Sequence, residues 1–225
     1  TDESLYAMQY LGPPFTFGVN LVSENITTMG PLAAVPVEDN VFWMGLKEFY
    51  AYGGTVQRLP CTVRDYVFDD INLAQREKIV ASSNTSFSEV WWFYPSATSE
   101  VNDRYVVYNY QQQIWYYGTL SRSFWMDRGI FDQPIAAGPN NYLYSQETGF
   151  DDDGAAFTAY IESSQIDIGD GDSFAFIKRM IPDVTFRGST AASPSANFTI
   201  KTRNFPGGDY LQSTEKQVTK TASVP

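Results

Sequence analysis

Short aromatic runs alternate with polar loops along the middle of the chain. Three of these runs begin at Val41, Val90 and Tyr142, so their starts lie 49 and then 52 residues apart. Each run is followed by a turn and a second apolar stretch, at residues 49–52, 105–110 and 157–161. Aromatic and β-branched side chains fit the pleated, half-buried surface of a sheet, so the pattern predicts strands.

The second of these units shows the clearest succession of strands and turns. A polar loop at residues 95–104 separates its first two strands, and Gln111–Gln113 marks a reversal before residues 114–117. Ser123–Met126 is the predicted fourth strand. Four short strands in about 40 to 50 residues are typical of one blade of a β-propeller. We therefore predict an all-β fold of propeller-like blades, with an aromatic-rich β-sandwich as the alternative.

Aromatic residues make up 16% of the chain and are expected to form its cores. Large aromatic side chains commonly fill the space between packed sheets. In either fold, the positions expected to be buried between sheets include Trp43, Trp91, Trp92, Trp115 and Trp125.

Three segments are distinguished along the chain. Residues 1–40 mix short apolar runs with Gly and Pro, which predicts strand edges and connections at the end of a preceding blade or domain. Residues 41–206 hold the propeller-like blades, and residues 207–225 the start of a following segment.

A helix is predicted at residues 69–80, where two aspartates precede good helix formers. Because the chain begins without Met and stops after a strand-like stretch, we expect it to be part of a longer protein.

The charge balance bears on possible partners. The formal net charge is -11, so general binding of nucleic acid is not expected, because phosphate contacts come mainly from Lys and Arg. A DNA channel lined with acidic side chains would use that repulsion, while ordinary solubility is the alternative explanation. No apolar run approaches the roughly 20 residues of a spanning helix, so no membrane span is expected. The first residues have no basic and then apolar segment, so we do not expect them to be a signal peptide.

Two residue types narrow the possible chemistry. The chain has no His, which excludes histidine triads, histidine general bases and histidine metal ligands. Cys61 is the only cysteine, so no internal disulfide can form, and its apolar neighbours predict a small buried residue.

Two aspartate-rich stretches are candidate ion sites. Asp151-Asp152-Asp153-Gly154 has the composition of a hairpin turn, and three adjacent side chains cannot all point at one ion. The segment Asp167–Asp172 alternates Asp with Gly, as calcium loops do, but its twelfth position is Lys178 where a bidentate Glu would be needed. Flanking residues 164–166 and 174–177 read as strands, so a tight hairpin explains it without a metal. We predict no metal and no cofactor, with an ion at Asp167–Asp172 left open.

A carboxylate-based glycosidase is the sharpest enzymatic possibility. It requires two carboxyls across a sugar, one with a raised pKa, and aromatic faces for stacking. Nothing in the sequence selects a pair, so we predict no catalytic residues and a protein that is not an enzyme. The acids considered are Glu89, Asp103, Asp127, Glu147 and Glu162.

Several motifs between residues 64 and 206 resemble a known family. They include Phe87–Ser96, Asp103–Tyr110, Trp115–Leu120, Trp125–Gly129 and Tyr144–Gly149, followed by Ile161-Glu162-Ser163, Asp170-Gly171-Asp172 and Arg179–Asp183. Together they resemble the tail nozzle, or tail-hub, virion proteins of short-tailed and related bacteriophages.

The resemblance implies a structural function. It implies a propeller-bearing virion subunit, expected as a homohexamer at the distal end of the phage tail. Such a ring would continue the DNA channel, hold the genome before DNA ejection, and contact neighbouring adaptor, fibre or spike proteins. Genomic DNA would pass without specific binding. The alternative is a carbohydrate-binding or glycan-cleaving propeller that recognises the receptor.

Overall fold

The computed structural model describes residues 3–149, 151, 154, 159–163, 166, 173–187, 189, 191–205 and 207–219. Two compact units divide the chain, Thr1–Ala155 and Ala156–Pro225. The described residues form seventeen strands, one short α-helix and two 3-10 helices, and every strand pair is antiparallel. The predicted all-β class is therefore confirmed, whereas the propeller assignment stays a prediction.

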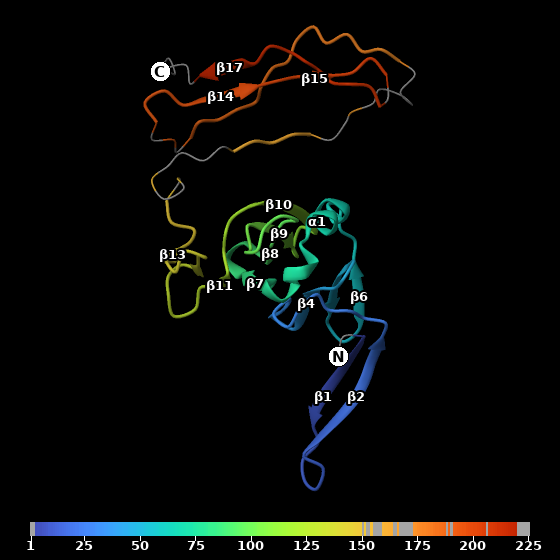
Figure 1. Ribbon diagram of the computed structural model, residues 1–225. Helices are drawn as coiled ribbons and strands as arrows, with labels where there is room; N and C mark the ends of the chain where they lie inside the picture. The colour runs from blue at the N-terminus through green and yellow to red at the C-terminus, as the bar shows by residue number, and fades with distance from the viewer. Residues whose placement is uncertain are drawn as a thin grey trace. The chain divides into compact units, whose positions relative to one another are not determined.

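Three consecutive antiparallel sheets form most of the first unit (Figure 1). The first contains β3 (Ala34–Val37), β4 (Asn40–Met44), β5 (Phe49–Tyr52) and β6 (Val56–Leu59). The second contains β7 (Val80–Asn84), β8 (Glu89–Tyr94), β9 (Arg104–Asn109) and β10 (Ile114–Thr119). The third contains β11 (Phe124–Met126), β12 (Ile135–Ala137) and β13 (Leu143–Ser145). In each sheet the strands pair in chain order, as in a simple meander.

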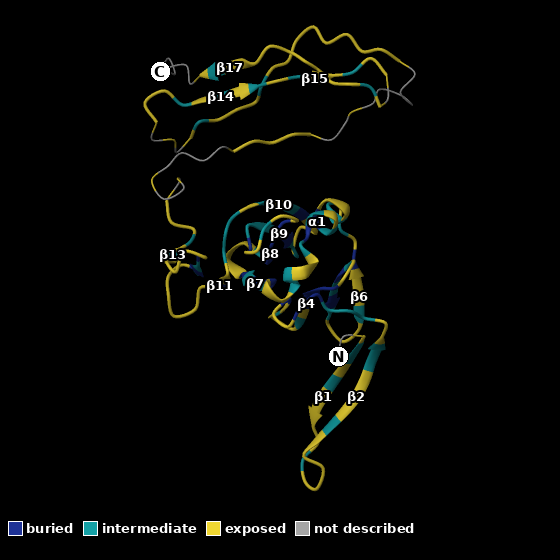
Figure 2. Ribbon diagram, in the orientation of Figure 1, coloured by how far each residue is buried: buried dark blue, intermediate teal, exposed yellow. Residues whose placement is uncertain are grey.

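The central strand β8 of the second sheet is buried on both faces, between the first sheet and the third. Alternate side chains of a strand point to opposite faces. Val90, Trp92 and Tyr94 of β8 accordingly join a core with the first sheet, whereas Trp91 and Phe93 join a core with the third. All six residues of β8 are buried, which appears in Figure 2 as dark blue at the centre of the unit. Because β8 has no solvent face, its residues 90–94 can form an unbroken apolar run.

All five tryptophans are buried, and four of them lie in the cores between sheets, as predicted. Trp43 is the exception, because it lies on the face of the first sheet that points away from the core. Each indole N–H donates to an oxygen elsewhere in the first unit. Four of these donors reach backbone carbonyls in other segments, at 2.8–3.1 Å: Trp43 to Thr27, Trp92 to Ala33, Trp115 to Pro60 and Trp125 to Ser83. Burying an unpaired donor would be costly, so these bonds allow the large rings to enter the core. The tryptophans therefore pack against the sheets and also hold other segments in place through these hydrogen bonds.

The spacing of the predicted repeat is partly corrected by the structure. The strands at 41 and 90 correspond, because β4 and β8 are each the second strand of a four-stranded sheet. The strand near Tyr142 exists as β13, but it is the third strand of its sheet, and the corresponding second strand is β12. The second stretch of this unit is not a strand at residues 159–161, and residues 157 and 158 lie outside the described residues.

Ser123–Met126 was predicted as the fourth strand of the middle unit, and this is wrong. The strand β11 begins the third sheet, and the missing strand of the middle sheet is β7, which precedes β8. The strand β7 was not predicted because its sequence is mostly small and polar. Its buried positions are Val80, Ser82 and Asn84, and two of these three are polar. The first sheet likewise begins at Ala34, within the range predicted to belong to a preceding blade.

The predicted helix at 69–80 is replaced by two shorter elements. The α-helix α1 spans Arg64–Asp70, and the 3-10 helix η1 spans Leu73–Lys78; a second 3-10 helix, η2, spans Thr85–Phe87. Asn72 caps η1 by accepting a hydrogen bond from the Ala74 N–H, so the cap lies after the two aspartates. Extended backbone at Ile71, which bridges to Ser96, separates the helices. No helix in the described part of the chain has the length and apolar character needed to cross a bilayer.

The N-terminal hairpin projects from the first sheet (Figure 1). It consists of β1 (Ser4–Tyr10) and β2 (Phe17–Glu24), and its turn contains Pro13 and Pro14. Pro36 lies in β3, which pairs only with β4 and is an edge strand. The predicted restriction of these prolines to edges and connections is confirmed, since proline cannot donate to a ladder.

The second unit has little regular structure. Its strands are β14 (Ser195–Phe198), β15 (Lys201–Thr202), β16 (Leu211–Gln212) and β17 (Lys216–Thr219), paired as β14–β17 and β15–β16. Residues 174–177, predicted as a strand, have irregular backbone, and no described residue of this unit is buried. Without a packed face, the apolar side chains there gain no burial that would favour a strand over irregular backbone.

Replacement of Trp92 by Ala should destabilise the protein by about 3 to 5 kcal/mol, because a fully buried aromatic ring is removed and a cavity is left. Urea unfolding followed by tryptophan fluorescence measures this loss. The matched control is Tyr142→Ala, since Tyr142 is two-thirds exposed and should cost less than about 0.5 kcal/mol. Equal, small losses for both variants would contradict the assigned core.

Candidate functional site

Two of the acids considered from the sequence, Glu89 and Glu147, come together between the second and third sheets. Glu89 begins β8 and is paired in register with Asn84 of β7. Glu147 follows β13, and its carboxylate Oε1 accepts a hydrogen bond from Asn84 Nδ2 at 3.3 Å. Asn84 thus connects two acids that are 58 residues apart in the sequence. Only the return of the third sheet toward β7 brings them together.

Two aromatic side chains hold the Glu89 carboxylate. Trp91 Nε1 donates to Glu89 Oε2 at 2.8 Å, and the Tyr116 hydroxyl donates to Glu89 Oε1. Burial raises the pKa of Tyr116 above its ordinary value, and the hydrogen bond to Glu89 raises it further, so this hydroxyl remains a donor. Both oxygens of this buried carboxylate are therefore occupied by protein donors. Charge-assisted bonds of this kind fix β8 to β10.

Glu147 has a different environment from Glu89. Glu147 is exposed, but partial desolvation raises its pKa, and the nearby charge of Glu89 raises it further, while the hydrogen bond from Asn84 opposes the shift. Asn84 is fully buried, and its Oδ1 has no hydrogen-bond partner among the described residues. The two acids therefore differ. Both oxygens of Glu89 accept hydrogen bonds from protein donors, whereas Glu147 keeps its proton to a higher pH than an ordinary glutamate does.

The remaining three acids make contacts elsewhere, apart from Glu89 and Glu147. Asp103 accepts hydrogen bonds from the N–H and hydroxyl of Ser96, both at 2.7 Å, and so closes the loop after β8. Asp127 accepts from the Ser83 hydroxyl at 3.0 Å and the Thr85 N–H at 2.9 Å. Glu162 lies in the second unit and pairs with Lys201 at 2.8 Å.

The aspartate-rich stretches are only partly described. Asp151 Oδ1 accepts a hydrogen bond at 2.9 Å from the N–H of Gly154, whose φ is 84°, as expected for a turn. Asp152 and Asp153 lie outside the described residues, as does all of Asp167–Asp172. Within the described part of the chain, no three His, Cys, Asp or Glu side chains are grouped so that they could hold a metal ion.

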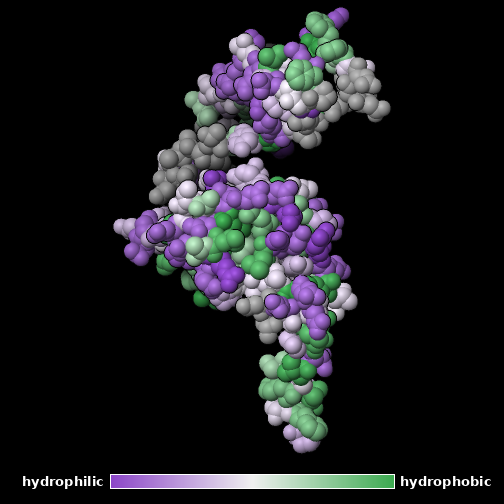
Figure 3. All heavy atoms as spheres, turned by 45° about the vertical axis from the view of Figure 1, so that its right-hand side comes forward, coloured by the Kyte–Doolittle hydropathy of each residue, from purple (hydrophilic) through white to green (hydrophobic). Residues whose placement is uncertain are grey.

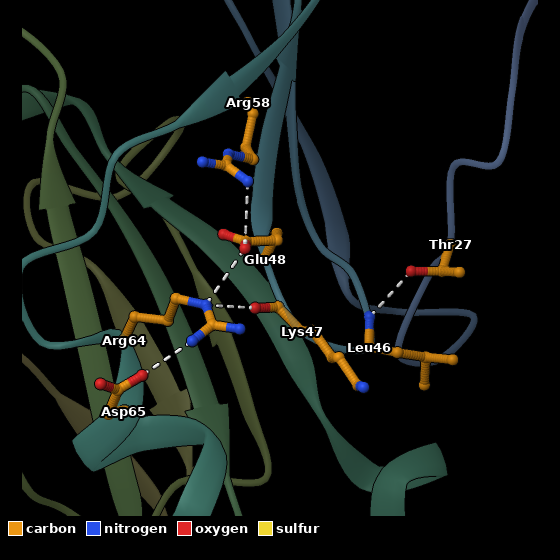
Figure 4. A network of polar contacts seen from close by, with 7 residues as sticks. All are labelled: Thr27, Leu46, Lys47, Glu48, Arg58, Arg64 and Asp65. Atoms are coloured by element: carbon orange, nitrogen blue, oxygen red, sulfur yellow. Dashed lines mark hydrogen bonds and ion pairs between the residues drawn. The ribbon is translucent and has the colours of Figure 1, made fainter.

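A polar network fixes the turn between β4 and β5 (Figure 4). Glu48 contacts Arg58 at 3.4 Å and Arg64 at 3.2 Å, and Arg64 also donates to the Lys47 carbonyl at 2.8 Å. These groups are partly exposed, so each pair is worth at most about 1 kcal/mol. Their effect is to join the start of α1 to the first sheet, which makes this network architectural.

Cys61 was predicted to be a buried residue, but it is only half-buried. It nevertheless packs against the core between the first two sheets. Burial raises the pKa of its thiol to about 11, so the thiolate, the reactive form, is scarce at neutral pH.

The aromatic side chains near the carboxylate pair are packed against one another. Trp91 and Trp125 stack with their ring centroids 5.2 Å apart, and both are buried. Arg122 lies over the Tyr144 ring at 4.3 Å. A sugar would require exposed aromatic faces beside the two acids, and here the tryptophan faces contact other rings.

Comparison with protein-family models gives no match, and comparison with curated protein sequences finds no similar chain.

Replacement of Glu147 by Gln should reduce the pH dependence of stability. The folded state holds the Glu147 proton to higher pH than the unfolded chain does, because the folded pKa is raised. Its contribution is therefore most favourable below the unfolded pKa of about 4.3 and is lost as pH rises through the folded pKa. Gln keeps an acceptor for Asn84 but carries no charge.

Urea unfolding between about pH 4 and pH 7 tests this expectation. The free energy of unfolding should fall less with pH in Glu147→Gln than in the wild type. The exposed residue Glu100, replaced in the same way, serves as the control and should follow the wild type. Parallel curves for Glu147→Gln and wild type would contradict the raised pKa.

Proposed function

We propose that this chain is a structural component of a bacteriophage tail, of the nozzle or tail-hub type, and that it acts without catalysis. In this proposal it assembles as a homohexamer in the virion and surrounds the channel through which genomic DNA is ejected. Neighbouring adaptor, fibre or spike proteins attach to the ring. The resemblance of residues 64–206 to that family is the starting point.

One structural observation carries the proposal. In the first unit, antiparallel meanders follow one another along the chain and pack face to face through tryptophan-rich cores, and the second and third of these meanders lie within the resembling region. Neighbouring blades of a propeller pack in the same manner. The radial packing of a propeller would leave only short, protected strand edges, which suits a particle that must persist outside cells.

The charge of the chain supports the channel role. With a net charge of -11, six copies would place a large negative charge around DNA. Like charges repel, so the duplex would slide past the wall without sticking to it.

The second unit supports a role in a larger assembly. Its described part has no buried residue, and several large apolar side chains are more than three-quarters exposed, among them Tyr160, Ile161, Ile166, Phe174 and Phe176. Monomeric proteins rarely leave many large apolar side chains uncovered, and such surface commonly marks an interaction site. We propose that neighbouring subunits cover these side chains in the virion.

A carbohydrate-binding or glycan-cleaving propeller is the second candidate. The proximity of Glu89 and Glu147, with a raised pKa on one of them, favours it. Against it stand the two aromatic donors on Glu89 and the buried faces of Trp91 and Trp125. The structural role therefore accounts for more of the observations.

The full-length protein should form a ring of about six subunits with a central channel, as the family resemblance implies, and such a ring would have closed cyclic symmetry. Light scattering gives the mass, and electron microscopy of the protein alone and with tail components gives the shape. A monomer or trimer without a channel would contradict the proposal and would make a glycan-binding screen the next experiment.

A further inference from the structure

The β1–β2 hairpin, called the arm below, has one apolar face. Three cross-strand pairs lie on that face: Tyr6 with Leu21, Met8 with Val19, and Tyr10 with Phe17. The last pair is in edge-to-face contact, with ring centroids 5.9 Å apart. The opposite face carries small or polar residues, among them Ala7, Gln9, Gly18 and Asn20. The arm is therefore amphipathic, as a strand pair is when one face packs on another surface.

This apolar face is uncovered within the chain. Its six side chains are 49–69% exposed, and Phe15 in the turn is 71% exposed. Figure 3 shows hydrophobic residues gathered along the projecting arm. Residues 5–23 contain no Asp, Glu, Lys or Arg, although the whole chain has 41 such residues. A two-stranded hairpin alone is marginally stable in water, so the arm is suited to packing on another surface.

A complementary apolar groove lies at the base of the arm. It has a volume of about 470 Å³ and is bounded by the arm and by the face of the first sheet that points away from its core. From that sheet, Ala34, Val41, Trp43 and Tyr52 line it. The other contributors are Thr27, Thr28, Ile26, Val22 and residues 4–7, and none of the lining residues is charged.

We infer that the arm of one copy seats in the groove of a second copy of this chain. The apolar ladder, with Phe15 at its end, packs along the outer face of the partner's first sheet. The inference rests on the self-association within the proposed function and identifies the surface responsible for it.

Charge and area both favour a second copy as the occupant. Copies that each carry a charge of -11 repel one another, so contact is favoured where both surfaces are uncharged, as the arm and groove are. Seven large apolar side chains at this exposure offer on the order of 100 Å² each, close to the roughly 800 Å² that each partner gives to a standard interface.

The arrangement also has a defined symmetry. The outer part of the arm and the outer face of the first sheet are different surfaces of one chain, although Tyr6 at the base of the arm belongs to both the ladder and the groove lining. A head-to-tail contact therefore uses one arm and one groove per copy. Repetition of that contact closes a ring if the rotation allows it, and two copies that exchange arms form a dimer. In both cases the same residues meet.

The first experiment compares the self-association of three full-length proteins by analytical ultracentrifugation over a concentration series. The arm variant combines Met8→Gln with Val19→Thr, which keeps the side chains similar in size but makes the pair polar. The matched control combines Gln9→Thr with Asn20→Thr on the opposite face of the same arm. We expect the arm variant to weaken association by about tenfold or more, and the control to resemble the wild type.

A cross-linking experiment tests the location of the contact, even if a variant changes the arm itself. With Cys61 replaced by Ser, a Phe15→Cys chain is mixed with a Val41→Cys chain and treated with a short bismaleimide. A cross-linked pair of chains is expected. Phe15→Cys mixed with Glu100→Cys, an exposed position in another loop, is the control and should give little product.

The outcomes separate this inference from the proposed function. Rings with a channel that persist unchanged in the arm variant, without the Phe15–Val41 product, would overturn the inference and leave the proposed function standing. An arm-dependent dimer with that product would support the inference and contradict the hexameric ring. Arm-dependent flotation with phosphatidylcholine vesicles, without arm-dependent association, would overturn the inference in favour of a lipid surface.

Discussion

Burial of β8 on both faces is the constraint on which the rest of the first unit depends. Its side chains alternate between two cores, Trp92 with the first sheet and Trp91 with the third. A strand in this position has no solvent face, so a charged side chain in it is costly unless hydrogen bonds compensate for its burial. The one acid in it, Glu89, is accommodated because Trp91 and Tyr116 donate to its two oxygens.

The same constraint explains the polar cluster beside the third sheet, in which Glu89 and Asn84 are buried and Glu147 is exposed. The face of the second sheet that carries Trp91 is covered mainly by the short strands β11 and β12. The return of the chain after β13 brings Glu147 onto Asn84, where partial desolvation and the charge of Glu89 disfavour its ionised form. Because Glu147 keeps its proton more readily, the electrostatic repulsion between the two acids is smaller. The cluster is thus a consequence of stacking three sheets in a row.

Apolar side chains are left uncovered in both units of the chain. Beyond the first sheet lie the groove and the arm, whose hydrophobic ladder has no partner within the chain. In the second unit, the described side chains are likewise uncovered. Exposed apolar surface of this kind commonly marks an interaction site, and the proposed self-association would cover it.

The sequence by itself determined the fold class, the strand positions at residues 41–44, 49–52, 90–94 and 105–109, and the burial of all five tryptophans, because aromatic composition and turn residues act locally. It did not determine which strands share a sheet. β7 was missed because Ser82 and Asn84 are buried and polar, and Phe124–Met126 was placed in the wrong sheet because strand order depends on long-range pairing. Only the tertiary structure selected Glu89 and Glu147 from among five acids, since their contact depends on Asn84 and on a return of the chain that no local pattern encodes.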